Sequence, residues 1–220
     1  MFANEQIIYQ PAFYFFIAAT IVLSVAFRWG RKANQAIIHR TFKPLLSILK
    51  GRDQQYTNIG GSTGYHIRFK PTALRIVGEV TGTLTLLPRH SLLYLPIPLL
   101  TGRRDKLVLS FDFNKKGNKI AGEAHLVTPR QLRRPHSAVD NAELTRRELQ
   151  WGELSYLGFW GNEDSQANMQ RLIGLLGDPT SLEHVAIVPS QSRVWLVITP
   201  RKNAVARIIA AVATWLDEIA

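Results

Sequence analysis

The residues that first suggest a chemical activity form the sequence Gly60-Gly61-Ser62-Thr63-Gly64. It matches G-x-S-x-G, the pattern that exposes a nucleophilic serine on a sharp turn between a strand and a helix. The flanking sequence does not fit such a turn, because a polar stretch precedes it and an alternating, strand-like stretch follows it. We therefore interpret the segment as a glycine-rich loop and keep a membrane-tethered hydrolase that uses Ser62 as an alternative.

Other residues capable of catalysis or metal binding are not arranged in a pattern that predicts either. No two of the six histidines have the i, i+4 spacing that places two metal ligands on one helical face. The adjacent carboxylates Glu163 and Asp164 lie at an expected helix start, and Asp217 and Glu218 at an expected helix end, where capping or solvation explains them. The sequence therefore predicts no enzymatic activity, no metal and no cofactor.

Positive charge is the most prominent chemical feature of the chain. The formal net charge is +11 and the isoelectric point is about 10.3. The candidate binding residues occur in small clusters: Arg103, Arg104, Lys115, Lys116, Arg130, Arg133, Arg134, Arg201 and Lys202. A basic solvated surface explains any single cluster, but together they favour a polyanionic partner, either RNA or acidic lipid headgroups, whose binding weakens with salt.

A membrane anchor is predicted near the N-terminus, where residues 7–27 contain no charged side chain. At about 1.5 Å per residue this stretch is about 30 Å long, which matches the hydrocarbon thickness of a bilayer. Its apolar residues surround the helix instead of forming one stripe. The predicted membrane-contacting residues are Phe13, Phe15, Phe16, Ile17, Ile21, Val22, Leu23 and, at the interface, Trp29.

The charge distribution predicts the orientation of this anchor. All 27 Lys and Arg residues follow the uncharged stretch, so the positive-inside rule places the rest of the chain in the cytosol. A cleaved signal peptide is the alternative, since Ser24 and Ala26 form a small-x-small site, but the positively charged start of a signal peptide is missing. The absence of cysteine excludes disulfides and is compatible with a cytosolic domain.

Beyond the anchor, apolar residues recur at helical spacing over 33–50, with Pro44 as an expected kink. The polar residues 51–64 are expected to form a loop. We divide the chain into a short luminal N-terminus (residues 1–6), a transmembrane helix (7–28), a juxtamembrane amphipathic helix with its loop (29–63) and a cytosolic α+β domain (64–220).

Alternating and β-branched sequence predicts strands over residues 65–69, 72–89 and 106–113. Residues 90–102 are apolar enough for a helix, but Pro96 and Pro98 predict a short turn and an extended piece instead. Residues 121–128 are expected to form a strand in an antiparallel hairpin with 106–113, and residues 129–149 a helix interrupted near Pro135.

The last third gives the clearest patterns. Asn162 or Asp164 is expected to cap a helix that ends at Gly177, and residues 183–190 and 193–200 form a predicted hairpin. A final amphipathic helix over 205–219 is expected to lie across the sheet. We therefore predict an α+β fold with a mainly antiparallel sheet covered by helices.

The order of these elements resembles the calumin family, whose members belong to the PAT (protein associated with translocon) membrane chaperone complex. The likeness extends through VGEVTGTLTLLPRHSLLYL, RRDKLVLSFDFN and HLVTPRQL to LSYLGFWGNEDSQANMQRLIGLLGDPTSLEHVAIVPS and RVWLVITP. The resemblance implies a scaffold or chaperone subunit in the endoplasmic reticulum membrane, with a luminal N-terminus and a cytosolic domain, that assists the insertion of multipass membrane proteins. The partners that it implies are an Asterix-like small membrane protein, the Sec translocon, the ribosome with its rRNA and nascent multipass membrane proteins.

Two departures from this family limit what we expect. The family's long acidic luminal segment, associated with calcium binding, has no counterpart in residues 1–6, where only Glu5 is acidic, so calcium handling is not expected. The family's charged C-terminal coiled coil has no counterpart before Ala220. Because the positive charge also suits acidic lipid headgroups, a peripheral adaptor that binds anionic membrane lipids stays open beside the ribosome-binding scaffold.

Overall fold

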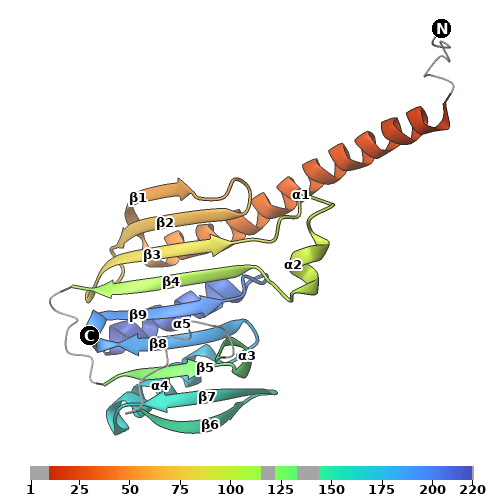
Figure 1. The fold of residues 1–220 in the computed structure, drawn as a ribbon. Helices are drawn as coiled ribbons and strands as arrows, with labels where there is room; N and C mark the ends of the chain where they lie inside the picture. Colours follow the sequence, from red (N-terminus) through yellow and green to blue (C-terminus); the bar gives the residue numbers. More distant parts are fainter. Residues whose placement is uncertain (1–9, 115–121, 133–143, 220) are drawn as a thin grey trace.

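The computed structural model describes residues 10–114, 122–132 and 144–219. A long N-terminal helix, an antiparallel sheet and two further helices on one face of that sheet form the main architecture (Figure 1). The predicted α+β class and the mainly antiparallel sheet are confirmed.

Helix α1 (Pro11–Leu49) joins the predicted anchor and the predicted amphipathic helix into one element of 39 residues. Pro11 lies in its first turn, where a backbone N–H would have no partner within the helix. Lys50 caps the end of the helix, because it adopts the left-handed conformation and donates its N–H to the Leu46 carbonyl. Pro44 lies inside the helix and does not end it.

The two halves of α1 differ in burial. The most apolar window of the helix is not buried against the rest of the protein, and its length and composition allow it to cross a bilayer. The predicted membrane-contacting side chains are exposed, except Phe13, which is half-buried. The second half packs on the sheet through residues at helical spacing: Gly30, Asn34, Ile37, Thr41, Phe42, Leu45 and Leu49.

Nine antiparallel strands form the sheet in the order β1-β2-β3-β4-β9-β8-β5-β7-β6, within the described residues. The first four are β1 (Gly51–Asn58), β2 (Gly64–Pro71), β3 (Val77–Thr85) and β4 (Lys106–Phe113). The others are β5 (Ala124–Val127), β6 (Thr145–Trp151), β7 (Leu154–Trp160), β8 (Leu182–Val188) and β9 (Arg193–Ile198). The C-terminal hairpin β8–β9 therefore lies in the middle of the sheet, between β4 and β5.

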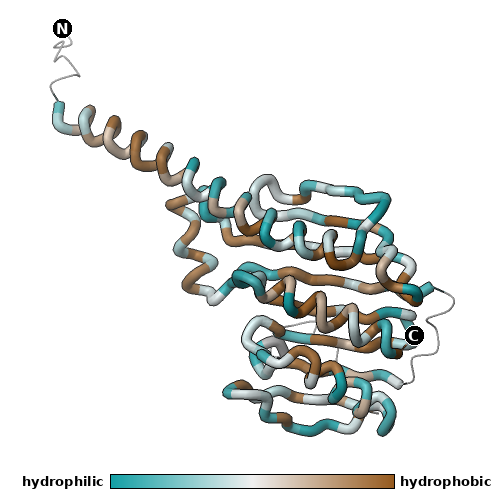
Figure 2. The backbone as a smooth tube through the Cα atoms, turned by 180° about the vertical axis from the view of Figure 1, so that it is seen from behind, coloured by the Kyte–Doolittle hydropathy of each residue, from teal (hydrophilic) through white to brown (hydrophobic). Residues whose placement is uncertain are grey.

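Three helical segments cover the same face of the sheet: the second half of α1, α4 (Glu163–Leu176) and α5 (Ala204–Glu218) (Figures 1 and 2). Helix α5 packs against both α1 and α4. Its fully buried Trp215 donates its indole N–H to the Asn168 carbonyl of α4. The core lies between these helices and the sheet, and it includes Leu45, Leu109, Leu196 and Val212.

Several predictions from the last third of the chain are confirmed. Asn162 caps α4 in a capping box with Ser165, and the chain leaves this helix at Gly177. Strands β8 and β9 form the predicted hairpin, and α5 forms the predicted final helix. The predicted strand over 106–113 corresponds to β4.

Two segments with polar sequences were predicted wrongly. Residues 51–58 form β1 instead of a loop, and residues 145–151 form β6 instead of the end of a helix. Both are edge strands with mostly exposed side chains, so no alternation of buried and exposed residues marks them. Only Pro129–Leu132, the short helix α3, is helical in the described part of the predicted helix over 129–149.

Two further predictions were wrong in the middle of the chain. Strand β5 does not form a hairpin with β4, because β8 and β9 lie between them and β5 pairs with β7 and β8. Residues 96–100 form the short helix α2 (Pro96–Leu100) instead of an extended piece. Pro96 is compatible with this helix because it occupies the first turn.

Candidate functional site

One end of the sheet carries most of the features that suggest function. We call it the anchor end, because α1 leaves the sheet there on its way to its apolar half (Figure 1). It comprises the β1–β2 turn (residues 59–63), the segment between β3 and β4 (86–105), α3 and the segment between β9 and α5 (199–203). The opposite end, where α1 ends and β1 begins, is called the far end.

Asn34 of α1 connects the helix to two segments of the anchor end. Its side chain is fully buried, and its amide nitrogen donates to the carbonyls of Ser62 at 2.9 Å and Leu87 at 3.0 Å. Its amide oxygen accepts a hydrogen bond of 3.0 Å from the Arg89 guanidinium. A buried polar side chain with all its groups bonded fixes one arrangement of the elements around it.

Arg89 is fixed in turn by Asp105. The guanidinium donates to both oxygens of the Asp105 carboxylate, at 2.9 and 2.6 Å, and the same carboxylate accepts the backbone N–H of Leu87 at 2.9 Å. Bidentate pairs of this kind hold both partners in a defined orientation. The Asp105 carboxylate thus holds the two ends of the 86–105 segment together, and Arg89 links them to Asn34 of α1.

Gly30 allows α1 to approach this segment closely. A Cβ atom at position 30 would lie 2.0 Å from the Arg89 carbonyl oxygen and 2.4 Å from the His90 nitrogen, both of which are backbone atoms. Only glycine fits this contact, since no side chain has to be accommodated. Gly30 and Asn34 lie one turn apart, so the same face of α1 makes both contacts.

Ser62 lies beside a histidine. Its hydroxyl is 2.8 Å from Nδ1 of His90, whose ring packs edge-on against Phe27 of α1 with 5.7 Å between ring centroids. The serine belongs to a β-hairpin turn, in which Ile59 N–H donates to the Gly64 carbonyl. It is therefore not on the strand-to-helix turn of an α/β-hydrolase. In the described part of the chain no carboxylate is bonded to the His90 ring.

The predicted basic residues fall into two described groups, both at the anchor end. Arg103 and Arg104 are exposed after α2, and Arg130 of α3 joins them because its guanidinium donates to the Gly102 carbonyl. Arg201 and Lys202 are exposed before α5, beside a hollow of about 330 Å³. Lys115, Lys116, Arg133 and Arg134 lie outside the described residues.

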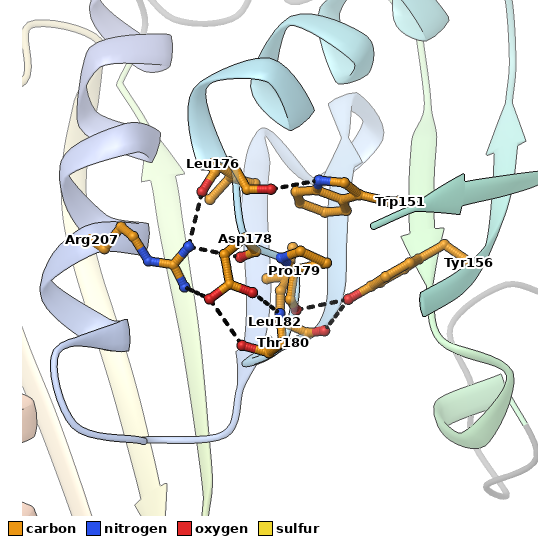
Figure 3. A network of polar contacts seen from close by, with 9 residues as sticks. Trp151, Tyr156, Leu176, Asp178, Pro179, Thr180, Leu182 and Arg207 are labelled. Atoms are coloured by element: carbon orange, nitrogen blue, oxygen red, sulfur yellow. Dashed lines mark hydrogen bonds and ion pairs between the residues drawn. The ribbon is translucent and has the colours of Figure 1, made fainter. Parts of the chain in front are cut away.

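A polar network holds the segment between α4 and β8 at this end of the sheet (Figure 3). Arg207 of α5 donates to the carbonyls of Leu176 and Asp178 and to the Asp178 carboxylate. Hydrogen bonds from Thr180, followed by the charge of Arg207, lower the pKa of Asp178. The bonds of Arg207 join α5 to the end of α4, and both helices cover the sheet. We therefore interpret this network as structural.

Tyr156 is fully buried. Figure 3 shows its hydroxyl directed at the segment between α4 and β8. Its hydroxyl lies 3.0 Å from the Pro179 carbonyl and 2.6 Å from the Leu182 carbonyl. Burial is the main cause of the raised pKa of Tyr156, and the charges of Asp178 and Glu183 add to it. The neutral hydroxyl therefore serves as a fixed donor that ties β7 to the start of β8.

Two histidines lie buried on the face of the sheet that the helices do not cover. Nδ1 of His125 and Nε2 of His184 are 3.4 Å apart, and Nε2 of His125 is 2.8 Å from the Glu123 carboxylate. Burial lowers the pKa of both rings, that of His184 to about 3. In the described ranges no three His, Cys, Asp or Glu side chains are grouped as metal ligands.

Sequence patterns did not identify the residues that hold α1 to the sheet. Gly30, Asn34 and Arg89 belong to segments whose contact depends on the tertiary fold, and Asp105 is a single acidic residue among basic ones. One sequence pattern could have indicated this contact. Asn34 follows Gly30 by one helical turn, on the same buried face of the helix as Ile37 and Thr41.

No protein-family model matches this chain, and a search of curated proteins gives no match either.

Proposed function

We propose that this protein is a membrane-anchored scaffold whose α1 crosses a bilayer once and holds the sheet domain at the membrane surface. The observation that carries this proposal is the continuity of α1. Its exposed apolar half runs without a break into a half that the sheet buries, and Asn34 and Gly30 fix the junction. A helix that is apolar on all sides and not covered by the rest of the chain favours a lipid environment.

The proposed orientation follows from charge. Arg28, Arg31 and Lys32 come directly after the uncharged stretch, which favours the cytosolic side for the sheet domain. The anchor end then faces the bilayer and the far end faces the cytosol. This gives the basic groups at the two ends different partners.

The proposed setting is the insertion of multipass membrane proteins in the endoplasmic reticulum, beside the Sec translocon and an Asterix-like partner. The ordered resemblance to calumin-like proteins and the net charge of +11 support it. At the far end Lys50, Arg52 and Arg75 are exposed. All three lie at the far end, Lys50 and Arg52 around the start of β1, and Arg75 in the segment between β2 and β3. We propose that these side chains contact ribosomal RNA from the cytosolic side.

Co-sedimentation of the detergent-solubilised full chain with ribosomes tests this part. We expect binding that weakens as salt increases and that is lost on reversal of the far-end charges by Lys50→Glu, Arg52→Glu and Arg75→Glu. The matched control, Arg103→Glu with Arg104→Glu, changes charge at the anchor end and is expected to leave ribosome binding intact. Absent or salt-insensitive binding contradicts the ribosome proposal and leaves the membrane anchor standing.

A second candidate is a hydrolase that uses Ser62, because the 2.8 Å contact with His90 is the geometry in which a histidine takes a proton from a serine hydroxyl. A serine-reactive fluorophosphonate probe distinguishes the two proposals. Labelling that Ser62→Ala and His90→Gln both abolish supports catalysis. For a scaffold we expect no labelling above that of the Ser62→Ala variant, with the hydroxyl contact serving to hold the turn against the 86–105 segment.

A further inference from the structure

Residues 91–102 form an apolar projection at the anchor end, which we call the α2 lip. Leu93 and Leu100 expose 79% and 87% of their surface, and neighbouring apolar side chains are also exposed. The exposed set comprises Leu92, Leu93, Tyr94, Ile97, Leu99 and Leu100. A group of this kind within ten residues is unusual on a protein surface in water and marks a site of interaction with an apolar partner.

The α2 lip begins beside the apolar half of α1. Figures 1 and 2 both show α2 next to the place where α1 leaves the sheet. Arg89 contacts Gly30, and the His90 ring contacts the Phe27 ring, which belongs to the uncharged stretch of α1. The lip is therefore placed at the depth where α1 enters the bilayer.

The α2 lip is fixed and not a loose loop. Tyr94 and Leu95 donate their N–H groups to the Ser91 carbonyl, and Arg103 donates its N–H to the Pro98 carbonyl at 2.8 Å. Pro96 and Pro98 restrict the backbone of the short helix. Because the backbone is already ordered, burial of the exposed leucines in an apolar medium costs little conformational entropy.

Positive side chains lie next to the C-terminal end of the α2 lip. Arg103 and Arg104 follow the lip directly and are exposed, and Arg130 is bonded to Gly102 at its base. An apolar surface bordered by Arg residues is typical of segments that enter the interface of a membrane containing anionic lipids. Tyr94 adds an aromatic ring of the type enriched at membrane interfaces.

We propose that the α2 lip inserts into the interfacial region of the same bilayer that α1 crosses, with Arg103, Arg104 and Arg130 against anionic headgroups, which rests on the proposed crossing by α1. A single helix leaves a domain free to tilt about its exit point. A second point of contact, rigidly joined to α1 through Asn34 and Arg89, fixes the orientation of the sheet relative to the membrane.

The natural absence of cysteine allows a direct depth measurement on the full chain. Single cysteines at Leu93, Leu100, Val22 and Tyr56 carry an environment-sensitive fluorophore, in vesicles of phosphatidylcholine and phosphatidylserine with a fraction of lipids spin-labelled near the headgroup. Val22 reports on α1, and the exposed Tyr56 of β1 serves as the control outside the membrane. We expect the spin-labelled lipids to quench most of the fluorescence at Leu93 and Leu100, and the remaining emission to be shifted to the blue by the apolar surroundings. Neither change is expected at Tyr56.

The four positions separate the failure of the lip from the failure of the anchor. If Val22 is in lipid while Leu93 and Leu100 behave like Tyr56, the lip proposal is wrong and the anchor stands. A Val22 label outside lipid overturns both. A cysteine at Leu93 that is shielded from a water-soluble thiol reagent in native membranes, but whose fluorophore is not quenched in vesicles, assigns the lip to a protein partner. That result also overturns the proposal.

Charge provides an independent check on the source of the attraction. We expect Arg103→Glu with Arg104→Glu to reduce the quenching at Leu93 in anionic vesicles, while the quenching at Val22 stays unchanged. The matched pair Lys50→Glu with Arg52→Glu at the far end is expected to change neither label. Equal effects of the two pairs on the Leu93 label would contradict a specific contact between the lip and anionic headgroups.

Discussion

Gly30 of α1 lies directly against the backbone carbonyl of Arg89, so closely that a Cβ atom would stand 2.0 Å from that oxygen. The contact joins α1, next to its exposed apolar half, to the segment that carries the α2 lip. One turn further along, Asn34 bonds to the same segment and to the β1–β2 turn. The apolar half of α1 is therefore joined to the domain by a close, hydrogen-bonded contact and not by a flexible linker.

Replacement of Gly30 tests the closeness of this junction. Gly30→Ala is expected to lower the free energy of unfolding of the domain in detergent by roughly 1–3 kcal/mol, the usual cost of overpacking, because backbone atoms must move. Gly174→Ala is the matched control, since no atom lies near its Cβ position in α4. We expect this control to gain about 0.5–1 kcal/mol. Equal effects of both substitutions in urea unfolding would contradict the contact.

Asn34→Leu tests the polar part of the junction. The substitution removes both donors from the Ser62 and Leu87 carbonyls and the acceptor from Arg89. We expect a loss of about 1–3 kcal/mol for each polar group left buried without a partner. Gln35→Leu, at the exposed neighbouring position, is expected to stay within about 0.5 kcal/mol of the natural protein. Thermal unfolding monitored by tryptophan fluorescence compares the two variants.

The elements in the first and last parts of the chain were predicted better from the sequence than those in the middle. The apolar half of α1, the capped helix α4, the hairpin β8–β9 and the stripe of α5 all show strong local patterns, which the structure retains. Strands β1 and β6 have no such pattern, because an edge strand that is exposed on both faces is stabilised by pairing with its neighbour.

Local sequence patterns also do not predict the order in which the strands pair. Strand β5 follows β4 in the sequence, yet β9 and β8 separate them in the sheet. The same limit applies to the contact between Ser62 and His90. Ser62 precedes β2 and His90 follows β3, so the two residues meet only because these strands pair. That Arg103, Arg104 and Arg130 would form one group likewise depends on the place of α3 in the fold.

The buried histidines predict a dependence of stability on pH. The unfolded chain binds a proton at His184 below about pH 6.5, whereas burial keeps its pKa in the folded chain at about 3. The free energy of unfolding should therefore fall as pH decreases from 6.5 toward 3, by up to about 1.4 kcal/mol per pH unit for one such group. The lowered pKa of His125 acts in the same direction.

Substitution of His184 isolates this contribution. We expect His184→Phe to flatten the pH dependence of chemical unfolding in this window, because the ring already packs against Trp195 at 4.3 Å between centroids. His39→Phe, at an exposed position, is the matched control for the substitution itself. If His184→Phe unfolds with the same pH profile as the natural chain, another group must bind the proton.

The capping box of α4 gives a prediction about a covering helix. Asn162 accepts the Ser165 N–H at 2.8 Å, and Asn162→Ala removes that acceptor. We expect a loss of about 0.5–2 kcal/mol in the free energy of unfolding. Gln170→Ala, at an exposed position within the same helix, should remain within about 0.5 kcal/mol of the natural chain. A loss at position 170 as large as that at 162 would argue against the cap.

The central claim is that α1 crosses a bilayer, and alkaline carbonate extraction of membranes that carry the full chain tests it most directly. The predicted result is retention of the natural chain in the membrane pellet. Release is expected for the Ile17→Asp and Ile21→Asp double variant, because each aspartate near the helix centre costs about 2.5–3.5 kcal/mol of insertion free energy. Recovery of the natural chain in the supernatant, or equal retention of the double variant, would contradict a transmembrane α1.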